Sequence, residues 1–191
     1  MDSLIISFGS YLIGSIPFGF ILTKIFLKKD IRNIGSGNIG ATNALRTGNK
    51  LIGFATLALD IAKAILTVIF VKLNYPDYIF IASLSTFLGH VFPIWLNFRG
   101  GKGVATYVGI LFSINFIYSL VFIFSWAITF LISKYSSLSS ITASLMVPIY
   151  IIFFENNNSI FFIIMFVLVL YTHRENVKRL KNKEETKTKI Y

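Results

Sequence analysis

Long apolar segments constrain this 191-residue chain more than any other feature of its sequence. Crossing the hydrocarbon core of a bilayer, about 30 Å thick, takes roughly 20 consecutive apolar residues in a helix. Several segments approach or exceed that length with few charges, and hydrophobic residues make up 55% of the chain. Charged residues make up only 14%, against roughly 25% in ordinary soluble domains. The sequence therefore predicts an integral membrane protein. Disorder is excluded, and a chain without Cys cannot form a disulfide scaffold.

The apolar segments predict an all-α, polytopic membrane protein with about seven transmembrane helices in a single domain, 1–191. The expected spans are 3–27, 51–73, 78–96, 104–115, 117–134, 138–154 and 159–172. The segment 104–134 is too long for one ordinary span and short for two, and we favour two helices. The chain starts without the positive region and cleavage site of a signal peptide, so we expect its first span to be retained.

The positive charges predict how the helices are oriented. Sixteen of the 18 Lys and Arg residues fall on one side of the seven-span topology, and only Lys63 and Lys72 are left over. Loops rich in Lys and Arg lie on the cytoplasmic side of a membrane. We therefore expect the N-terminus outside, the C-terminus in the cytoplasm, and a basic cytoplasmic tail over 178–191. A single helix over 104–134 would make the charge distribution less one-sided.

A polar loop, 28–49, carries many groups that bind anions. Its glycines allow successive backbone N–H groups to point inward, and such nests bind phosphate oxygens. The candidate residues are Gly35, Ser36, Gly37, Asn38, Gly40, Thr42, Asn43 and Arg46. The glycine spacing also matches the dinucleotide-binding fingerprint, but that fold needs a βαβ unit, which flanking membrane helices exclude. A flexible connector is the alternative, although connectors rarely combine so many donors with so little charge.

A second glycine-rich loop, 97–103, surrounds one lysine. Gly101 and Gly103 flank Lys102, whose ammonium can bind phosphate as a point charge. Ser140 follows at the start of a later expected helix, where N–H groups attract anions and capping is the alternative role.

The end of the last expected span carries a further pair of polar residues. His173 and Asn176 are three residues apart and share one helix face. Asp60 and Lys63 are also three residues apart, but inside a span, where pairing offsets part of the cost of burying charge. Structural pairing and a direct role in the site both remain open for them. No His precedes an Asp by five positions, so the usual His–Asp acyltransferase dyad is absent. No paired carboxylates or clustered His suggest a metal, and we expect no cofactor.

These motifs resemble those of the bacterial acyl-phosphate:glycerol-3-phosphate acyltransferases. The matching segments are GSIPFG (14–19), IRNIGSGNIGATNALR (31–46), GHVFP (89–93), FRGGKGVAT (98–106), SLSS (137–140) and HRENVKRL (173–180). They occur in the order of the family over nearly the whole chain. Departures are minor: Ala64 and Lys183 stand where the family often has Gly.

The resemblance implies a membrane enzyme of phospholipid biosynthesis. It would transfer a fatty acyl group from acyl phosphate to the 1-hydroxyl of glycerol 3-phosphate, giving lysophosphatidic acid and phosphate, without acyl-CoA. It would work in a bacterial inner membrane, in contact with lipid, with its active site at the cytoplasmic face. We expect a monomer and no nucleic-acid partner.

The resemblance also assigns roles to the residues named above. Ser36, Asn38, Thr42 and Asn43 would cradle the phosphate of the acyl phosphate. Glycerol 3-phosphate and the reacting carbonyl would be held by Arg46, Lys102, Ser140, His173 and Asn176. Catalytic roles would fall to Ser36, Arg46, Lys102, His173 and Asn176, with the loop glycines and the remaining polar residues binding substrate.

Two other classes of function fit part of the sequence. A transporter or channel for phosphorylated solutes would also need a basic mouth, but it should have polar residues through the middle of several spans. Here the polar residues gather at one end of the spans. A non-enzymatic scaffold explains the helices and the positive side but not two glycine-rich donor loops.

Overall fold

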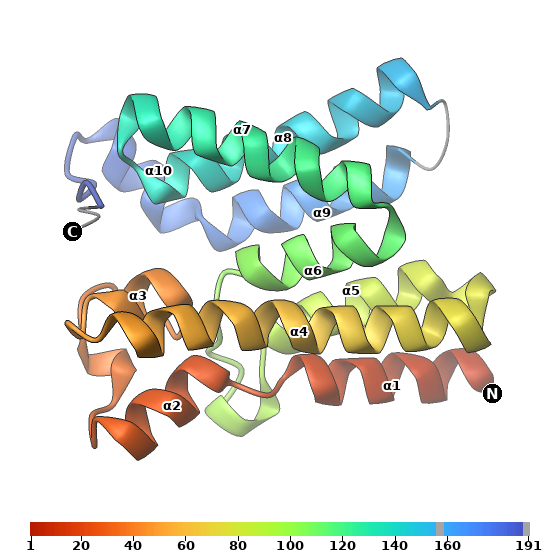
Figure 1. Ribbon diagram of the computed structural model, residues 1–191, viewed down its shortest axis with the longest axis horizontal. Coiled ribbons are helices and arrows are strands. Elements are labelled where there is room, and N and C mark those ends of the chain that lie inside the picture. Colours follow the sequence, from red (N-terminus) through yellow and green to blue (C-terminus); the bar gives the residue numbers. More distant parts are fainter. Residues whose placement is uncertain (156–158, 189–191) are drawn as a thin grey trace. The chain divides into compact units, whose positions relative to one another are not determined.

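The computed structural model describes residues 1–155 and 159–188, which contain helices and no β-strand (Figure 1). The chain divides into two compact units, Met1–Ile114 and Asn115–Tyr191. The first unit contains the helices α1 (Asp2–Gly14), α2 (Phe18–Phe26), η1 (Ile31–Asn33), α3 (Ala41–Leu45), α4 (Lys50–Asn74), η2 (Pro76–Tyr78), α5 (Ile79–Val91), η3 (Ile94–Leu96) and α6 (Val104–Ile114). The second contains α7 (Phe116–Ser133), α8 (Ser136–Phe154), α9 (Ser159–Thr172) and α10 (Arg174–Lys181).

Specific residues explain where the helices begin and break. The segment expected to be one span, 3–27, forms α1 and α2, and Pro17 stands immediately before α2. Proline lacks the N–H group that would continue a helical hydrogen-bond ladder. The segment 104–134 forms the two helices α6 and α7. Asn115 separates them as the N-cap of α7, because its Oδ1 accepts a hydrogen bond from the Ile117 N–H at 2.9 Å.

In the first unit, glycines let the helices approach closely. A Cβ added to Gly14 would lie 2.2 Å from the backbone oxygen of Thr86, and one added to Gly89 would lie 2.2 Å from that of Tyr11. Helix α1 therefore packs directly on α5, and α4 lies against α1 and α6. Small residues at such contacts are typical of helix packing in membranes.

In the second unit, α7 packs against α8 and α8 packs against α9 (Figure 1). Helix α10 continues from α9 after a bend of 62°. The tail folds back onto this unit, because the Thr188 N–H donates to the backbone oxygen of Lys134 at 2.9 Å.

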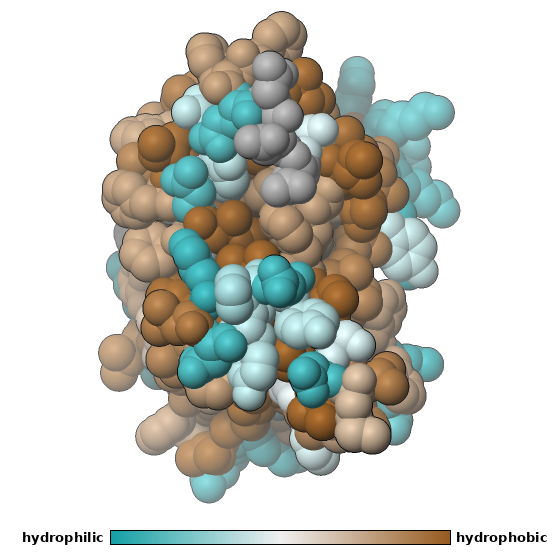
Figure 2. Space-filling view, turned by 90° about the vertical axis from the view of Figure 1, so that its right-hand side faces the viewer, coloured by the Kyte–Doolittle hydropathy of each residue, from teal (hydrophilic) through white to brown (hydrophobic). Residues whose placement is uncertain are grey.

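Five segments among the described residues are long and apolar enough to cross a membrane. They are Asp2–Phe26, Lys50–Asn74, Pro76–Leu96, Phe116–Ser133 and Ser136–Phe154. The bent pair Ser159–Thr172 and Arg174–Lys181 can count as a sixth, while Val104–Ile114 is a shorter apolar helix. Large hydrophobic side chains are exposed in both units, for example Leu4 in the first and Phe153 in the second. On the face drawn in Figure 2, hydrophobic residues cover much of the surface around a smaller hydrophilic area.

Candidate active site

One buried asparagine organises the first polar loop. Asn43, on the short helix α3, is only 2% exposed. Its Nδ2 donates to the backbone oxygens of Ile31, Ile34 and Asn38 at 3.1, 2.9 and 2.8 Å, and its Oδ1 accepts from the Ser36 N–H at 3.0 Å. The Asn43 side chain, which the family resemblance predicts to bind phosphate, is thus bonded to the backbone of the loop and fixes its shape.

The other candidate residues of this loop lie at its surface. Gly35 and Gly37 have φ values of +55° and +71°, which favour glycine. Ser36 and Thr42 are exposed. Asn38 accepts from the Gly40 N–H through Oδ1 at 3.2 Å. The Arg46 side chain lies against Gly35. A Cβ added to Gly35 would be 2.8 Å from Cδ of Arg46. The loop therefore combines exposed donors, constrained glycines and exposed cations, one of which is Arg46.

The second loop is packed tightly against the end of α5. The Gly100 and Gly101 N–H groups donate to the backbone oxygens of Val91 and His90 at 3.0 and 3.1 Å. A Cβ on Gly101 would lie 2.0 Å from Nε2 of His90, and Gly103 has a φ of +82° and contacts Phe87. Only glycine fits these positions, so the loop holds the half-buried Lys102 on a constrained backbone.

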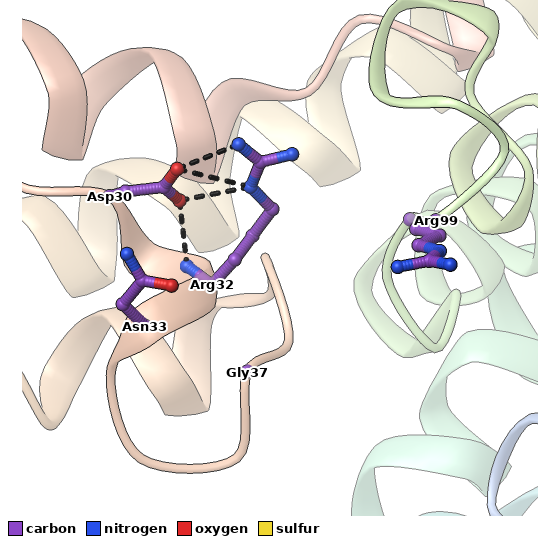
Figure 3. Close-up of a pocket in the computed structure, with 6 residues that line it drawn as sticks. Asp30, Arg32, Asn33, Gly37 and Arg99 are labelled. Atoms are coloured by element: carbon purple, nitrogen blue, oxygen red, sulfur yellow. Dashed lines mark hydrogen bonds and ion pairs between the residues drawn. The ribbon is translucent and has the colours of Figure 1, made fainter.

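A pocket of about 440 Å³ joins the two loops within the first unit. Its lining residues are Asp30, Arg32, Asn33, Gly37, Arg99 and Gly100. Arg32 forms a bidentate ion pair with Asp30, with Nη2 2.7 Å from Oδ2, and Arg99 faces this pair from the second loop (Figure 3). The hydrogen bond from the Arg32 guanidinium lowers the pKa of Asp30 to about 2, so both groups are charged at neutral pH.

A buried charged cluster lies behind the second loop. The Lys63 ammonium forms an ion pair with Asp60, with Nζ 2.8 Å from Oδ1. It donates hydrogen bonds to the backbone oxygen of Ile16 at 2.8 Å and to Nδ1 of His90 at 3.0 Å. All three side chains are at most 4% exposed. An ammonium can only donate, so Nδ1 of His90 accepts and the ring proton is on Nε2, the atom that lies against Gly101. The cluster therefore links α4 and α5 to the second loop.

The remaining candidate residues belong to the second unit. Ser140 donates to the backbone oxygen of Ser136 at 2.9 Å and accepts from Nε1 of Trp126 at 3.2 Å. His173 is 2% exposed, and its Nδ1 lies 2.8 Å from the backbone oxygen of Val169. A carbonyl can only accept, so Nδ1 carries the proton, and Nε2 is the acceptor atom of the neutral ring.

Asn176 is bound to a carboxylate of the tail. Its Nδ2 donates to Oε1 of Glu185 at 2.6 Å, and the same oxygen accepts from the Ser137 hydroxyl at 2.7 Å. Nε of Arg179 donates to Oε2 at 2.7 Å. Partial burial would raise the pKa of Glu185, but these three hydrogen bonds lower it below its usual value.

The structure thus places the candidate residues in two groups. Residues 35–46 and 101–103 lie in the first unit, on two loops that share a pocket; Ser140, His173 and Asn176 lie in the second. Sequence reasoning did not single out Arg32, Arg99 or Glu185. Arg99 could have been predicted as a pocket residue from its place in the glycine-rich loop. No feature of the tail sequence predicts that Glu185 binds Asn176. Within 1–155 and 159–188, no three His, Asp or Glu residues gather in a way that could hold a metal ion.

These features define a polytopic helical membrane protein whose polar loops combine hydrogen-bond donors with cations. The sequence profile described as "Glycerol-3-phosphate acyltransferase" matches residues 4–183. The glycerol-3-phosphate acyltransferase of Pelagibacter ubique (strain HTCC1062) is 81% identical over 100% of both chains. That of Anaplasma marginale (strain Florida) is 47% identical over 95% of this chain and 93% of its own.

Two crystal structures match over nearly the whole chain. Both are of PlsY (YgiH), an integral membrane glycerol 3-phosphate acyltransferase. The glycerol 3-phosphate form has a TM-score of 0.91 and 33% identity, covering 98% of this chain and 96% of that one. The lysophosphatidic acid form has a TM-score of 0.88 and 32% identity, covering 98% and 95%. The chain belongs to the glycerol-3-phosphate acyltransferase family, which confirms the resemblance seen in its motifs. It is an integral membrane acyltransferase that acts on glycerol 3-phosphate in phospholipid biosynthesis.

Proposed function

We propose that the enzyme transfers a fatty acyl group from acyl phosphate to the 1-hydroxyl of glycerol 3-phosphate and releases lysophosphatidic acid and phosphate. The observation that carries this proposal is the pair of glycine-rich loops at one pocket. They bring exposed N–H and hydroxyl donors together with Arg46, Lys102 and Arg99. Such a surface suits substrates that each carry a phosphate. The lysophosphatidic acid form of the related PlsY is consistent with the product.

The proposed chemistry is direct attack of the glycerol hydroxyl on the acyl carbonyl. The bond from carbonyl carbon to phosphate oxygen breaks as the new ester bond forms, and phosphate leaves. In this proposal a substrate phosphate takes the hydroxyl proton, since the candidate residues include no carboxylate. Donors and cations then act by orienting both substrates and stabilising the developing oxyanion. Trapping a covalent acyl-enzyme at Ser36 or Ser140 would refute this mechanism.

The proposed roles of individual residues follow the loops. Gly35, Gly37, Gly40 and the exposed donors of the first loop bind the phosphate of the donor, with Asn43 holding the loop in shape. Arg46, Lys102, Ser140, His173 and Asn176 hold glycerol 3-phosphate and the carbonyl. In this proposal residues 1–191 form a single catalytic domain, the protein is a monomer, and no cofactor takes part.

The proposed topology has seven spans. The five long apolar segments, the bent pair α9–α10 and the short α6 supply them. The basic loops and the tail 178–191 face the cytoplasm of a bacterial cell, and the N-terminus lies outside the inner membrane. This orientation follows from the position of the cations.

An assay of the purified protein tests the proposal. We expect lysophosphatidic acid from palmitoyl phosphate and glycerol 3-phosphate and none when palmitoyl-CoA replaces the acyl phosphate. Arg46→Ala and Lys102→Ala should each lower kcat/KM about 100-fold, the order of loss when a donor to developing charge is removed. Lys29→Ala removes an exposed cation outside the proposed site and should retain activity. Product formed only from palmitoyl-CoA would overturn the donor assignment.

A further inference from the structure

The tail of the second unit packs against that unit and is held there by hydrogen bonds. The Glu184 N–H donates to the backbone oxygen of Arg179 at 2.8 Å, and the Thr188 N–H donates to that of Lys134 at 2.9 Å. The Lys187 ammonium lies 5.9 Å from the centre of the Tyr135 ring. Between these anchors the Glu185 side chain is only 9% exposed. A segment that its composition marks as a solvated basic tail is therefore docked against the start of α8 and against α10.

The docked carboxylate fixes the orientation of the Asn176 amide. Glu185 accepts from Ser137 on α8 and from Asn176 and Arg179 on α10. An ionised carboxylate only accepts, so Nδ2 of Asn176 must face it and Oδ1 must face away. With Ser137 and Arg179 filling the other acceptor positions, the amide cannot rotate without losing a charge-assisted hydrogen bond.

The fixed amide leaves one buried acceptor without a partner. Asn176 is 4% exposed, and its Oδ1 has no hydrogen-bond partner within the described part of the chain. A buried acceptor of this kind is unfavourable unless something donates to it. Glycerol 3-phosphate carries two hydroxyl groups, and either can donate. Asn176 lies in α10, about one helical turn from His173, which is also proposed to bind glycerol 3-phosphate.

We propose that Glu185 is a positioning residue: its carboxylate holds the Asn176 amide so that Oδ1 accepts a hydrogen bond from a hydroxyl of the acceptor alcohol. This inference rests on the proposed role of Asn176 in binding glycerol 3-phosphate. Glu185 itself touches no substrate. The competing interpretation is that the carboxylate mimics a substrate phosphate and blocks the site. Against it, Glu185 uses two donors outside the proposed substrate set, Ser137 and Arg179, and is anchored on both sides along the chain.

Steady-state kinetics of the full-length purified protein, with palmitoyl phosphate and glycerol 3-phosphate varied separately, test the proposal. Glu185→Ala should lower kcat/KM for glycerol 3-phosphate about 10- to 100-fold, as expected when a substrate-binding group is slightly misplaced. The KM for palmitoyl phosphate should be unchanged. Glu185→Gln keeps one acceptor oxygen for Asn176 and should recover part of the loss. The matched control is Glu184→Ala, which removes the exposed neighbouring carboxylate and should behave as wild type.

A double-mutant cycle separates positioning from a general structural effect. If Glu185 acts through Asn176, then Glu185→Ala should add little in an Asn176→Ala background. Ser137→Ala removes one of the three donors and keeps the tail charge, so it should lower kcat/KM for glycerol 3-phosphate in the same selective way but by less. Thermal unfolding in detergent shows whether each variant is folded. If Glu185→Ala does not fold, Ser137→Ala and Glu185→Gln test the proposal in its place.

The proposal would be overturned by a gain of activity in Glu185→Ala, which indicates a blocking carboxylate, by an equal loss for both substrates, or by additive effects in the cycle. A fully active Asn176→Ala would remove Asn176 from the site, and this would refute both its proposed substrate role and the inference that rests on it. Activity lost in Asn176→Ala but unaffected in every Glu185 variant would leave the proposed function intact and reject the positioning role.

Discussion

At the residue scale, the protein combines charges in three distinct environments. Lys63 and Asp60 are paired inside α4 and almost fully buried, Arg32 and Asp30 are paired at the edge of a pocket, and Arg46 is exposed on the first loop. Net charge alone cannot distinguish these roles. The consequences of removing a partner differ accordingly, because a charge buried without its partner has lost its hydration and gained nothing in return.

The buried pair predicts a large loss of stability in Asp60→Asn. Removing one partner of a buried pair costs about 3–5 kcal/mol, because the Lys63 ammonium stays buried. Thermal unfolding in detergent measures the loss, with Asp77→Asn at an exposed turn as the control. The double variant Asp60→Leu with Lys63→Met should recover most of the stability. If it also retains activity, the pair is structural; an unfolding temperature unchanged in Asp60→Asn would contradict the buried pairing.

The close contact between Gly101 and His90 predicts that Gly101→Ala lowers both stability and activity. The added Cβ would lie 2.0 Å from Nε2 of His90, so either the ring or the second loop must move. Overpacking of this kind costs about 1–3 kcal/mol, and the loop that carries Lys102 should lose its alignment. We expect lower thermal stability together with lower acyl transfer. Gly9→Ala, where nothing lies within 4 Å of the new Cβ, is the matched control and should leave both unchanged. A stable, fully active Gly101→Ala would show that the loop tolerates displacement.

At the scale of elements, asparagines decide where several segments start and how one loop is held. Asn49 and Asn115 accept hydrogen bonds from Ile52 and Ile117 as N-caps of α4 and α7. Such caps can be anticipated from residue type and the apolar run that follows. The role of Asn43 could not, because its partners, Ile31 and Ile34, are brought near it only when the loop closes. The sequence therefore predicts a donor-rich loop correctly in composition but not which donor faces inward.

Asn43→Asp tests the internal role of this side chain. Asparagine and aspartate have the same shape, but an ionised carboxylate cannot donate to the three backbone oxygens that Nδ2 now serves. We expect the loop to open, seen as faster proteolysis between residues 34 and 46, and acyl transfer to fall about 10- to 100-fold as the donors are misplaced. Asn74→Asp, at an exposed helix end, is the control. An active, protease-resistant Asn43→Asp would refute the organising role.

The docked tail predicts a response to acid. Hydrogen bonds lower the pKa of Glu185 in the folded protein, so its contribution to docking is present above the ordinary carboxyl pKa. It is lost as the pH falls from that value through the lowered one. The hydrogen-exchange protection of residues 182–188, measured relative to the intrinsic exchange rate at each pH, should therefore fall on acidification. Glu185→Gln keeps one acceptor oxygen but no charge, so its tail should be less protected than that of the wild type at neutral pH and should not respond to acid. Equal protection in both proteins over the whole range would show that the carboxylate does not hold the tail.

At the scale of the whole molecule, the helical class and the family follow from sequence because both are encoded locally. Apolar length indicates the spans, and the loop motifs are long enough to identify the family, which the match over residues 4–183 confirms. The break at Pro17 also has a local cause, since proline lacks the N–H group that would continue the helix, but the tail contacts of Glu185 depend on how the folded tail packs. Composition carries little information about such contacts, since a docked tail and a solvated one can have the same residues.

The number of spans determines which side of the membrane each terminus occupies, and this is the last prediction. Seven spans place the two termini on opposite sides, whereas six place them on the same side. The chain has no cysteine, so single cysteines can be introduced without removing any. Asp2→Cys and Lys183→Cys report on the two ends, because both positions are exposed. With an impermeant maleimide, we expect Asp2→Cys to be labelled in intact cells and Lys183→Cys only in inside-out vesicles. Labelling of both from the same side would require an even number of spans and would remove α6 or the bent pair from the topology.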